Sequence, residues 1–146
     1  MDANRVRQMV ALVHAHGAEV VFHRAIDVTP DLHEACAKLA AAGIDRVLTS
    51  GGAPTALEGA EVIAGLQRDF GQRIQILAGS GVRAGNVADL VRKTCVTQVH
   101  SSCKGHAGDS TTCGAGVSFA YLNGALARSF EVVDEYEVRR LVSAAR

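Results

Sequence analysis

A histidine and an arginine stand side by side at the end of an apolar run near the start of the chain. His23 and Arg24 follow residues 20–22, and Asp27 lies three residues further on. An imidazole titrates near neutral pH, and a guanidinium binds carboxylate or phosphate oxygens in pairs. This group predicts a site for an anionic ligand. A purely structural Arg–Asp network is an equally weighted interpretation, because such networks gather at the same places.

Glycines and hydroxyl side chains follow the other apolar runs. The run Ile74–Leu77 leads into Gly79, Ser80 and Gly81, whose backbone N–H groups can bind an anion, although Gly-Ser-Gly also serves as a tight turn. The loop lacks the spacing of a nucleotide-binding motif. A serine–histidine nucleophile pair is disfavoured, because no third group is evident to orient the histidine. The remaining candidate ligand-binding residues are Thr49, Ser50, His100, Ser101 and Ser102.

One cluster has the residue types of a soft-metal site. Cys103, His106 and Cys113 follow His100 and would offer thiolate and imidazole ligands, which suit Cu(I) or Zn(II). Their spacing matches no zinc motif, and the segment that carries them is rich in glycine, so chance proximity is the favoured interpretation. These three residues are the candidate metal site.

The candidate residues follow apolar runs that recur at intervals of roughly 25 residues, the length of one strand–helix unit. Strands are expected at 19–23, 45–49, 73–78 and 97–101, and helices at 4–16, 29–43, 54–70 and 84–92. Residues 103–116 are expected to form a loop, 117–126 a strand or a helix, and 134–145 a final helix. The alternation predicts one α/β domain with a parallel sheet. All the polar clusters would then meet at the carboxyl edge of that sheet.

Composition limits the partners. The 146 residues include 15 basic and 15 acidic side chains, so the net charge is zero, which argues against nucleic acid and against an anionic membrane surface. No apolar run approaches the ~20 residues of a membrane span, and the first residues do not resemble a signal peptide. A cytoplasmic location is expected, with the four cysteines as thiols.

Four motifs, taken in order, resemble the copper homeostasis protein CutC family. They are Phe22–Asp27, Arg46–Gly51, Ala78–Arg83 and Val99–Ser102. The resemblance covers residues 1 to about 103 and, more loosely, 131–146. It implies a TIM-type (β/α) barrel, of which residues 1–146 would form a single partial domain. This domain would hold about four parallel strands with flanking helices, without the first four strand units.

The family resemblance also implies a function. Its members are described as cytoplasmic and are associated with copper binding, tolerance or trafficking, so copper is the implied ligand. The cysteines usually proposed as copper ligands belong to the part not matched, so that role does not transfer. Ile26 stands where phenylalanine is usual, and segment 103–116 is richer in cysteine and histidine than the family pattern. The residues that match family motif positions are His23, Arg24, Asp27, Thr49, Ser50, Gly79, Gly81, His100, Ser101 and Ser102.

Two alternatives stay open beside copper homeostasis. The first is a TIM-barrel enzyme that acts on a small phosphorylated or carboxylated metabolite through the His/Arg/Asp group and the glycine loop. The second is a truncated product with no activity of its own. A four-stranded sheet would also have two unpaired edges, which predicts a homo-oligomer or self-association through those edges.

Overall fold

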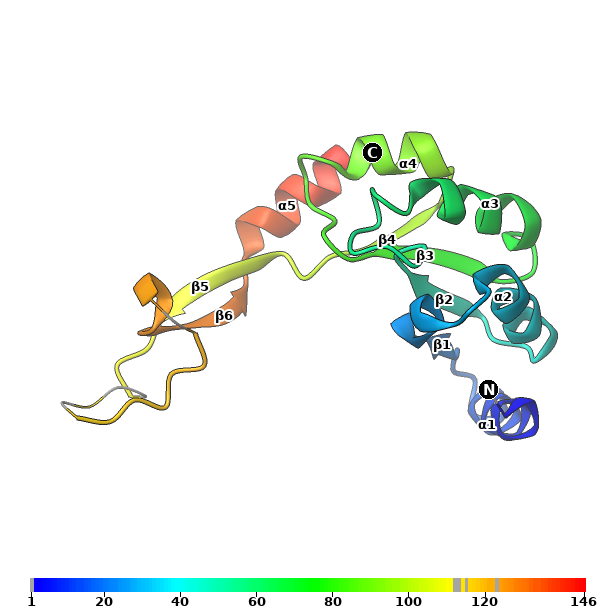
Figure 1. Ribbon diagram of the computed structural model, residues 1–146, viewed down its shortest axis with the longest axis horizontal. Coiled ribbons are helices and arrows are strands. Elements are labelled where there is room, and N and C mark those ends of the chain that lie inside the picture. The colour runs from blue at the N-terminus through cyan, green and yellow to red at the C-terminus, as the bar shows by residue number, and fades with distance from the viewer. Residues whose placement is uncertain (1, 112–113, 115, 123) are drawn as a thin grey trace.

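The computed structural model describes residues 2–111, 114, 116–122 and 124–146. Its main body is a parallel four-stranded sheet with the order β1-β2-β3-β4 (Figure 1). The strands are β1 (Val21–Phe22), β2 (Arg46–Thr49), β3 (Gln75–Gly79) and β4 (Gln98–His100). Because sequential strands are neighbours and all run the same way, their carboxyl ends share one edge, as the sequence predicted.

One face of this sheet is covered by the helices α2 (Leu32–Ala41), α3 (Ala60–Phe70) and α4 (Val87–Thr94) (Figure 1). The other helical elements are α1 (Ala3–Ala15), which precedes β1, the 3-10 helix η1 (Arg24–Val28), which follows β1, and α5 (Glu135–Ala144), which lies beside α4. Side chains alternate along a strand. Val47 and Ile76 are therefore buried in the helix-covered core, whereas their neighbours Leu48 and Leu77 are only partly buried on the opposite face. The parallel sheet with flanking helices confirms the predicted α/β class.

Two predicted helix starts are wrong in detail. The helix expected from residue 29 begins at Leu32, and Asp31 caps it, since its carboxylate accepts the Glu34 backbone N–H at 2.9 Å. The helix expected from residue 54 begins at Ala60 instead. Residues 54–59 form turns, in which the Ala56 backbone N–H donates to the Ser80 carbonyl rather than to a preceding helical turn. This segment is thereby joined to the loop after β3.

The region expected to be a loop contains a strand, so that prediction is wrong. β5 (Lys104–Gly108) pairs antiparallel with β6 (Ser129–Val133), and the two-stranded sheet projects from the main body (Figure 1). β5 has no β-branched or aromatic residue, so local preference gives no strand signal there. Among the described residues of the ambiguous segment 117–126, Gly124–Leu126 form a short 3-10 turn, η2, and Ser118 forms an isolated β-bridge.

The predicted final helix is confirmed as α5. The Asp134 side chain accepts the backbone N–H groups of Tyr136 and Glu137 and so caps its first turn. Leu141 packs against the main core, which returns the end of the chain to the sheet. Within the described part of the chain, no helix is long and apolar enough to span a bilayer.

Candidate functional site

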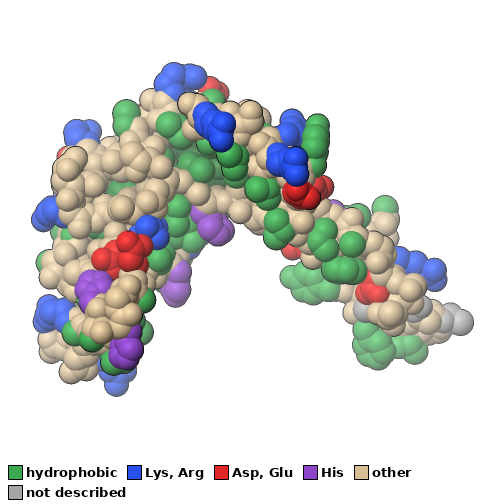
Figure 2. Space-filling model, turned by 180° about the vertical axis from the view of Figure 1, so that it is seen from behind, with side chains coloured by type: hydrophobic (Ala, Val, Ile, Leu, Met, Phe, Trp, Pro, Cys, Tyr) green, Lys and Arg blue, Asp and Glu red, His purple; other side chains and the backbone are tan. Residues whose placement is uncertain are grey.

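A pocket of about 520 Å³ lies at the carboxyl ends of β3 and β4. Its walls come from η1, from the loops after β3 and β4, and from α5. The charged and polar side chains in its lining are Arg24, Ser80, Arg83, His100, Ser101, Ser102, Lys104 and Glu137, together with the thiol of Cys103. The space-filling view shows histidine side chains on the concave side of the molecule (Figure 2).

Asp27 organises the region beside this pocket. Its carboxylate accepts hydrogen bonds from the Thr49 hydroxyl, from the backbone N–H of Ser50 at 3.1 Å and from that of Gly52 at 3.2 Å. Burial by itself would raise the pKa of this carboxyl. The bonds from Thr49, Arg24, Ser50 and Gly52 outweigh burial and lower the pKa below its ordinary value. Asp27 therefore remains a carboxylate near neutral pH and cannot supply a proton.

Arg24 is held by the same network. Its Nε donates to Asp27 at 2.8 Å, and one Nη donates to the Ser50 hydroxyl at 2.7 Å. The Asp27 side chain is 7% exposed and the Arg24 side chain 41% exposed. The buried carboxylate thus fixes the inner part of the guanidinium, while the rest of that side chain remains open to the pocket. Asp27, Thr49 and Ser50 position the site and do not line it.

The hydroxyls predicted at the carboxyl edge hold loops in place. Ser101 Oγ donates to the Val82 carbonyl at 2.7 Å and accepts the Cys103 backbone N–H at 3.2 Å. Ser80 Oγ donates to the Pro54 carbonyl at 2.8 Å. These bonds tie the loops after β2, β3 and β4 to one another. Their geometry explains the serines as structural groups at the pocket wall.

Gly79 and His100 are register partners on β3 and β4. A Cβ at Gly79 would lie 3.3 Å from the His100 Cβ and would crowd the Leu48 side chain, so glycine allows His100 to lie across the strand end. Gly81 has φ +68°, in the left-handed region that suits glycine. These glycines therefore shape the pocket through their lack of a side chain.

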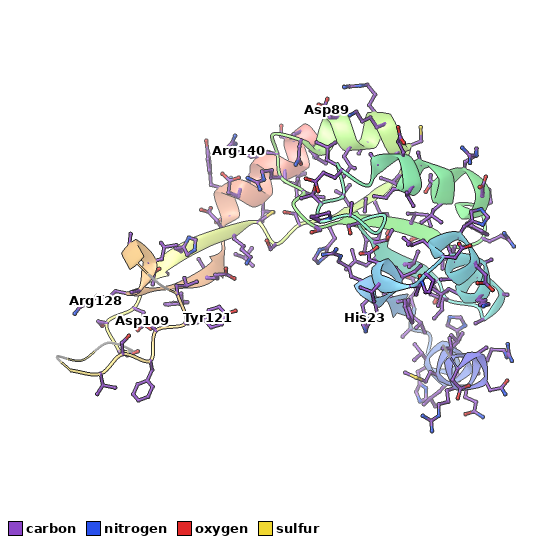
Figure 3. All side chains as sticks on the ribbon, viewed as in Figure 1. His23, Asp89, Asp109, Tyr121, Arg128 and Arg140 are labelled. Carbon is purple, nitrogen blue, oxygen red and sulfur yellow. The ribbon has the colours of Figure 1, made fainter. Side chains whose placement is uncertain are left out.

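His23 lies outside the pocket, although the sequence grouped it with the candidate site. Its Nδ1 accepts the Ala25 backbone N–H at 3.0 Å, so the imidazole caps η1. The ring also lies 5.5 Å from that of Phe22. The stick view shows His23 at η1 (Figure 3). His23 is exposed and has a structural contact at the start of η1, and its role in ligand binding stays a prediction.

The candidate metal residues occupy different surroundings. Cys103 is partly buried at the pocket, whereas His106 is exposed in the middle of β5. Residues three apart on an extended chain lie about 10 Å apart on opposite faces. Cys113 lies outside the described residues. Among the described residues, no group of three or more His, Cys, Asp or Glu side chains is placed to hold a metal ion, so the three-residue set stays a prediction.

Sequence reasoning did not select Arg83 and Lys104, which also line the pocket. Arg83 directly follows the glycine loop, so its position after β3 was available as a signal. Lys104 opens β5, and neither that strand nor its direction was expected from the sequence. Glu137 and Leu141 reach the pocket only because α5 folds back onto the sheet.

Comparison with known proteins identifies similar chains. The CutC family model matches residues 1–105. A family protein CutC from Caulobacter vibrioides is 45% identical over 105 residues, which are 72% of this chain and 42% of that protein. A family protein CutC from Porphyromonas gingivalis is 50% identical over 93 residues, which are 64% of this chain and 38% of that protein.

A solved structure gives the same result for the fold. The crystal structure of a protein from Streptococcus agalactiae, provisionally named copper homeostasis protein CutC, superposes with a TM-score of 0.61 at 31% sequence identity. The match covers 68% of this chain and 49% of that one. That structure is a TIM-type barrel, and the four strand–helix units of this chain form part of such a barrel, as predicted. The chain spans less than half the length of each of these three proteins.

Proposed function

This chain belongs to the CutC family, and from that membership we propose that it takes part in copper homeostasis in the cytoplasm by binding a copper ion. The provisional name of the Streptococcus agalactiae relative supports the copper assignment. The cytoplasmic part of the proposal is supported by cysteines that are free thiols in the described residues. In this role the copper ion is cargo that the protein binds and releases, not a resident cofactor.

One observation carries the proposal: an imidazole and a thiol line the same pocket at the carboxyl edge of the sheet. His100 stands at the end of β4, and Cys103 follows it by three residues, where the chain turns with φ +42°. Thiolate and imidazole are ligands that suit Cu(I). We assign Cys103 as the principal copper ligand and His100 as its partner. His106 and Cys113, which the sequence predicted together with Cys103, are the alternative ligands that the experiment has to distinguish.

The test is a Cu(I) titration of the purified protein against a chromophoric chelator under reducing conditions. Cys103→Ser is compared with Cys95→Ser. The pair is matched, because both cysteines have a left-handed backbone and Cys95 is an exposed thiol at the end of α4, outside the pocket. Changing a residue that only hydrogen-bonds to a metal ligand typically lowers metal affinity by ~10–100-fold, and removing the ligand itself is expected to lower it further.

Each outcome bears on a different ligand. The assignment is supported if Cys103→Ser has a much lower affinity for Cu(I) and Cys95→Ser keeps the wild-type affinity. His100→Ala is expected to have a lower Cu(I) affinity as well. Wild-type affinity in Cys103→Ser contradicts the assignment. If only His106→Ala and Cys113→Ser abolish binding, copper is bound through these two sequence-predicted ligands rather than by the pocket residues.

A further inference from the structure

Cationic side chains from three separate segments line the pocket. Arg24 comes from η1, Arg83 from the loop after β3, and Lys104 from the start of β5. Glu137 is the acidic residue in the lining, and its carboxylate already accepts a hydrogen bond from Arg140 at 3.0 Å. The lining therefore carries an excess of positive charge, although the chain as a whole has a net charge of zero. Concave sites of one charge concentrate ligands of the opposite charge.

Arg83 is available to a ligand. Among the described residues its guanidinium has no hydrogen-bond or ion-pair partner, whereas its backbone N–H donates to the Asn86 side chain at 2.9 Å. The Asn86 amide in turn donates to the Gly81 carbonyl at 2.9 Å. The backbone that carries Arg83 is thus fixed while its charge is free. An arginine fork in this state can bind two oxygens of one carboxylate or phosphate.

Lys104 can leave its present ion pair and contact an anion with little loss of stability. Its Nζ lies 2.7 Å from Glu131, and the two side chains are about half exposed. Exposed ion pairs contribute little to stability, so an anion in the pocket can compete for this ammonium group. Arg24 is already positioned at the pocket wall, because it donates hydrogen bonds to Asp27 and Ser50.

We propose that this pocket binds the oxyanion group of a small molecule, a phosphate or a carboxylate, between Arg83 and Lys104 with Arg24 as the third cation. This ligand is additional to copper, and it uses different side chains from those assigned to the metal. The pocket volume lies within the range of small-molecule sites, so the bound molecule can be larger than the anionic group itself.

Binding of inorganic phosphate and of succinate, measured by calorimetry and by the shift in melting temperature, tests this proposal. Sodium chloride at equal ionic strength removes the general effect of salt. Arg83→Gln and Lys104→Gln are compared with Arg92→Gln, which removes an exposed cation of α4 outside the pocket. Each pocket variant is expected to weaken binding by about tenfold or more, as for a lost charge-assisted hydrogen bond. Arg92→Gln is expected to bind like the wild type.

The outcomes separate this proposal from the copper proposal. Cys103→Ser is expected to keep phosphate or succinate binding, and Arg83→Gln is expected to keep copper binding. Binding of phosphate alone or of succinate alone identifies the class of anion. The proposal is overturned if neither anion binds the wild type, or if Arg83→Gln and Arg92→Gln bind equally well.

Discussion

Replacing Asp27 with alanine removes the group around which the carboxyl edge is built. The carboxylate accepts bonds from Thr49 and Ser50, which are both fully buried, and from Arg24 and Gly52. Water cannot readily replace an acceptor for the buried donors, and each unsatisfied donor costs about 1–3 kcal/mol. The Arg24 side chain is 41% exposed, so solvent screens its ion pair with Asp27 and the pair adds little. The two buried donors decide the magnitude, and at about 1–3 kcal/mol each we expect Asp27→Ala to lower the free energy of unfolding by about 2–6 kcal/mol.

Urea denaturation followed by circular dichroism measures this loss. Asp89→Ala is the matched control, because Asp89 (labelled in Figure 3) forms an exposed pair with Arg92 on α4. Such pairs are worth about 1 kcal/mol or less. The reasoning is refuted if the two variants unfold within about 1 kcal/mol of each other, since Asp27 would then contribute no more than a surface carboxylate.

Four further predictions follow from the same structure. The pKa of Asp27 is lower in the folded state than in the unfolded state. Its contribution to stability is therefore present above the ordinary Asp pKa and is lost as pH falls through the folded-state pKa. The free energy of unfolding of Asp27→Asn, measured by urea denaturation at several acid pH values, is expected to depend less on pH than that of the wild type. Burial raises the pKa of the Cys36 thiol to about 11, so iodoacetamide at neutral pH should modify exposed Cys95 first and Cys36 only on unfolding, as read by mass spectrometry. A Cβ at Gly59 would overlap the Ser50 carbonyl, so Gly59→Ala should destabilise by more than about 1 kcal/mol, whereas Gly85→Ala, which meets open space, should not. Equal melting temperatures for these two variants would contradict that packing. Sizing by light scattering is expected to show a dimer or larger species, because β1 and β4 each lack a second strand neighbour within the described residues, and a stable monomer would contradict it.

The main sheet could be predicted because its signals are local. Each strand is a short apolar run, and each is followed by a helix with its own start and stop residues, such as Gly43 after α2, where φ is +83°. Their alternation then leaves a parallel arrangement as the natural solution. The order of the four sequence motifs indicated the CutC family, and that resemblance predicted a partial barrel.

The β5–β6 pair could not be predicted, because its cause is not local. β5 is composed of small and charged residues, and the partner that makes it a strand begins at Ser129, more than twenty residues later. The return of α5 to the core through Leu141 is equally non-local. Both features determine which groups reach the pocket, so Lys104 and Glu137 were absent from the predicted site.

Several candidate site residues use their polar side-chain atoms to hold the main chain in place. His23, Ser80 and Ser101 have the side chains of catalytic groups, yet each uses its polar atom to bond the main chain of its own or a neighbouring loop. Only their distances to carbonyl and N–H groups show this. Sequence reasoning could therefore name polar residues at the carboxyl edge of the sheet, but it could not show which of them are bonded to the main chain.

The charged groups at this edge are arranged in a way that suits ligand binding. Among the described residues, two histidines pair with a carboxylate, His14 with Asp45 and His33 with Asp69, and both pairs lie outside the pocket. The Asp27 carboxylate beside the pocket already accepts hydrogen bonds from Arg24 and from the backbone N–H groups of Ser50 and Gly52. The pocket offers three cations, of which Arg24 is held in place by Asp27 and Ser50, beside a thiol and an imidazole. The cations can hold an anion, and the thiol, after losing its proton to solvent, can bind a soft metal ion together with the imidazole, so both proposals for this chain are binding functions.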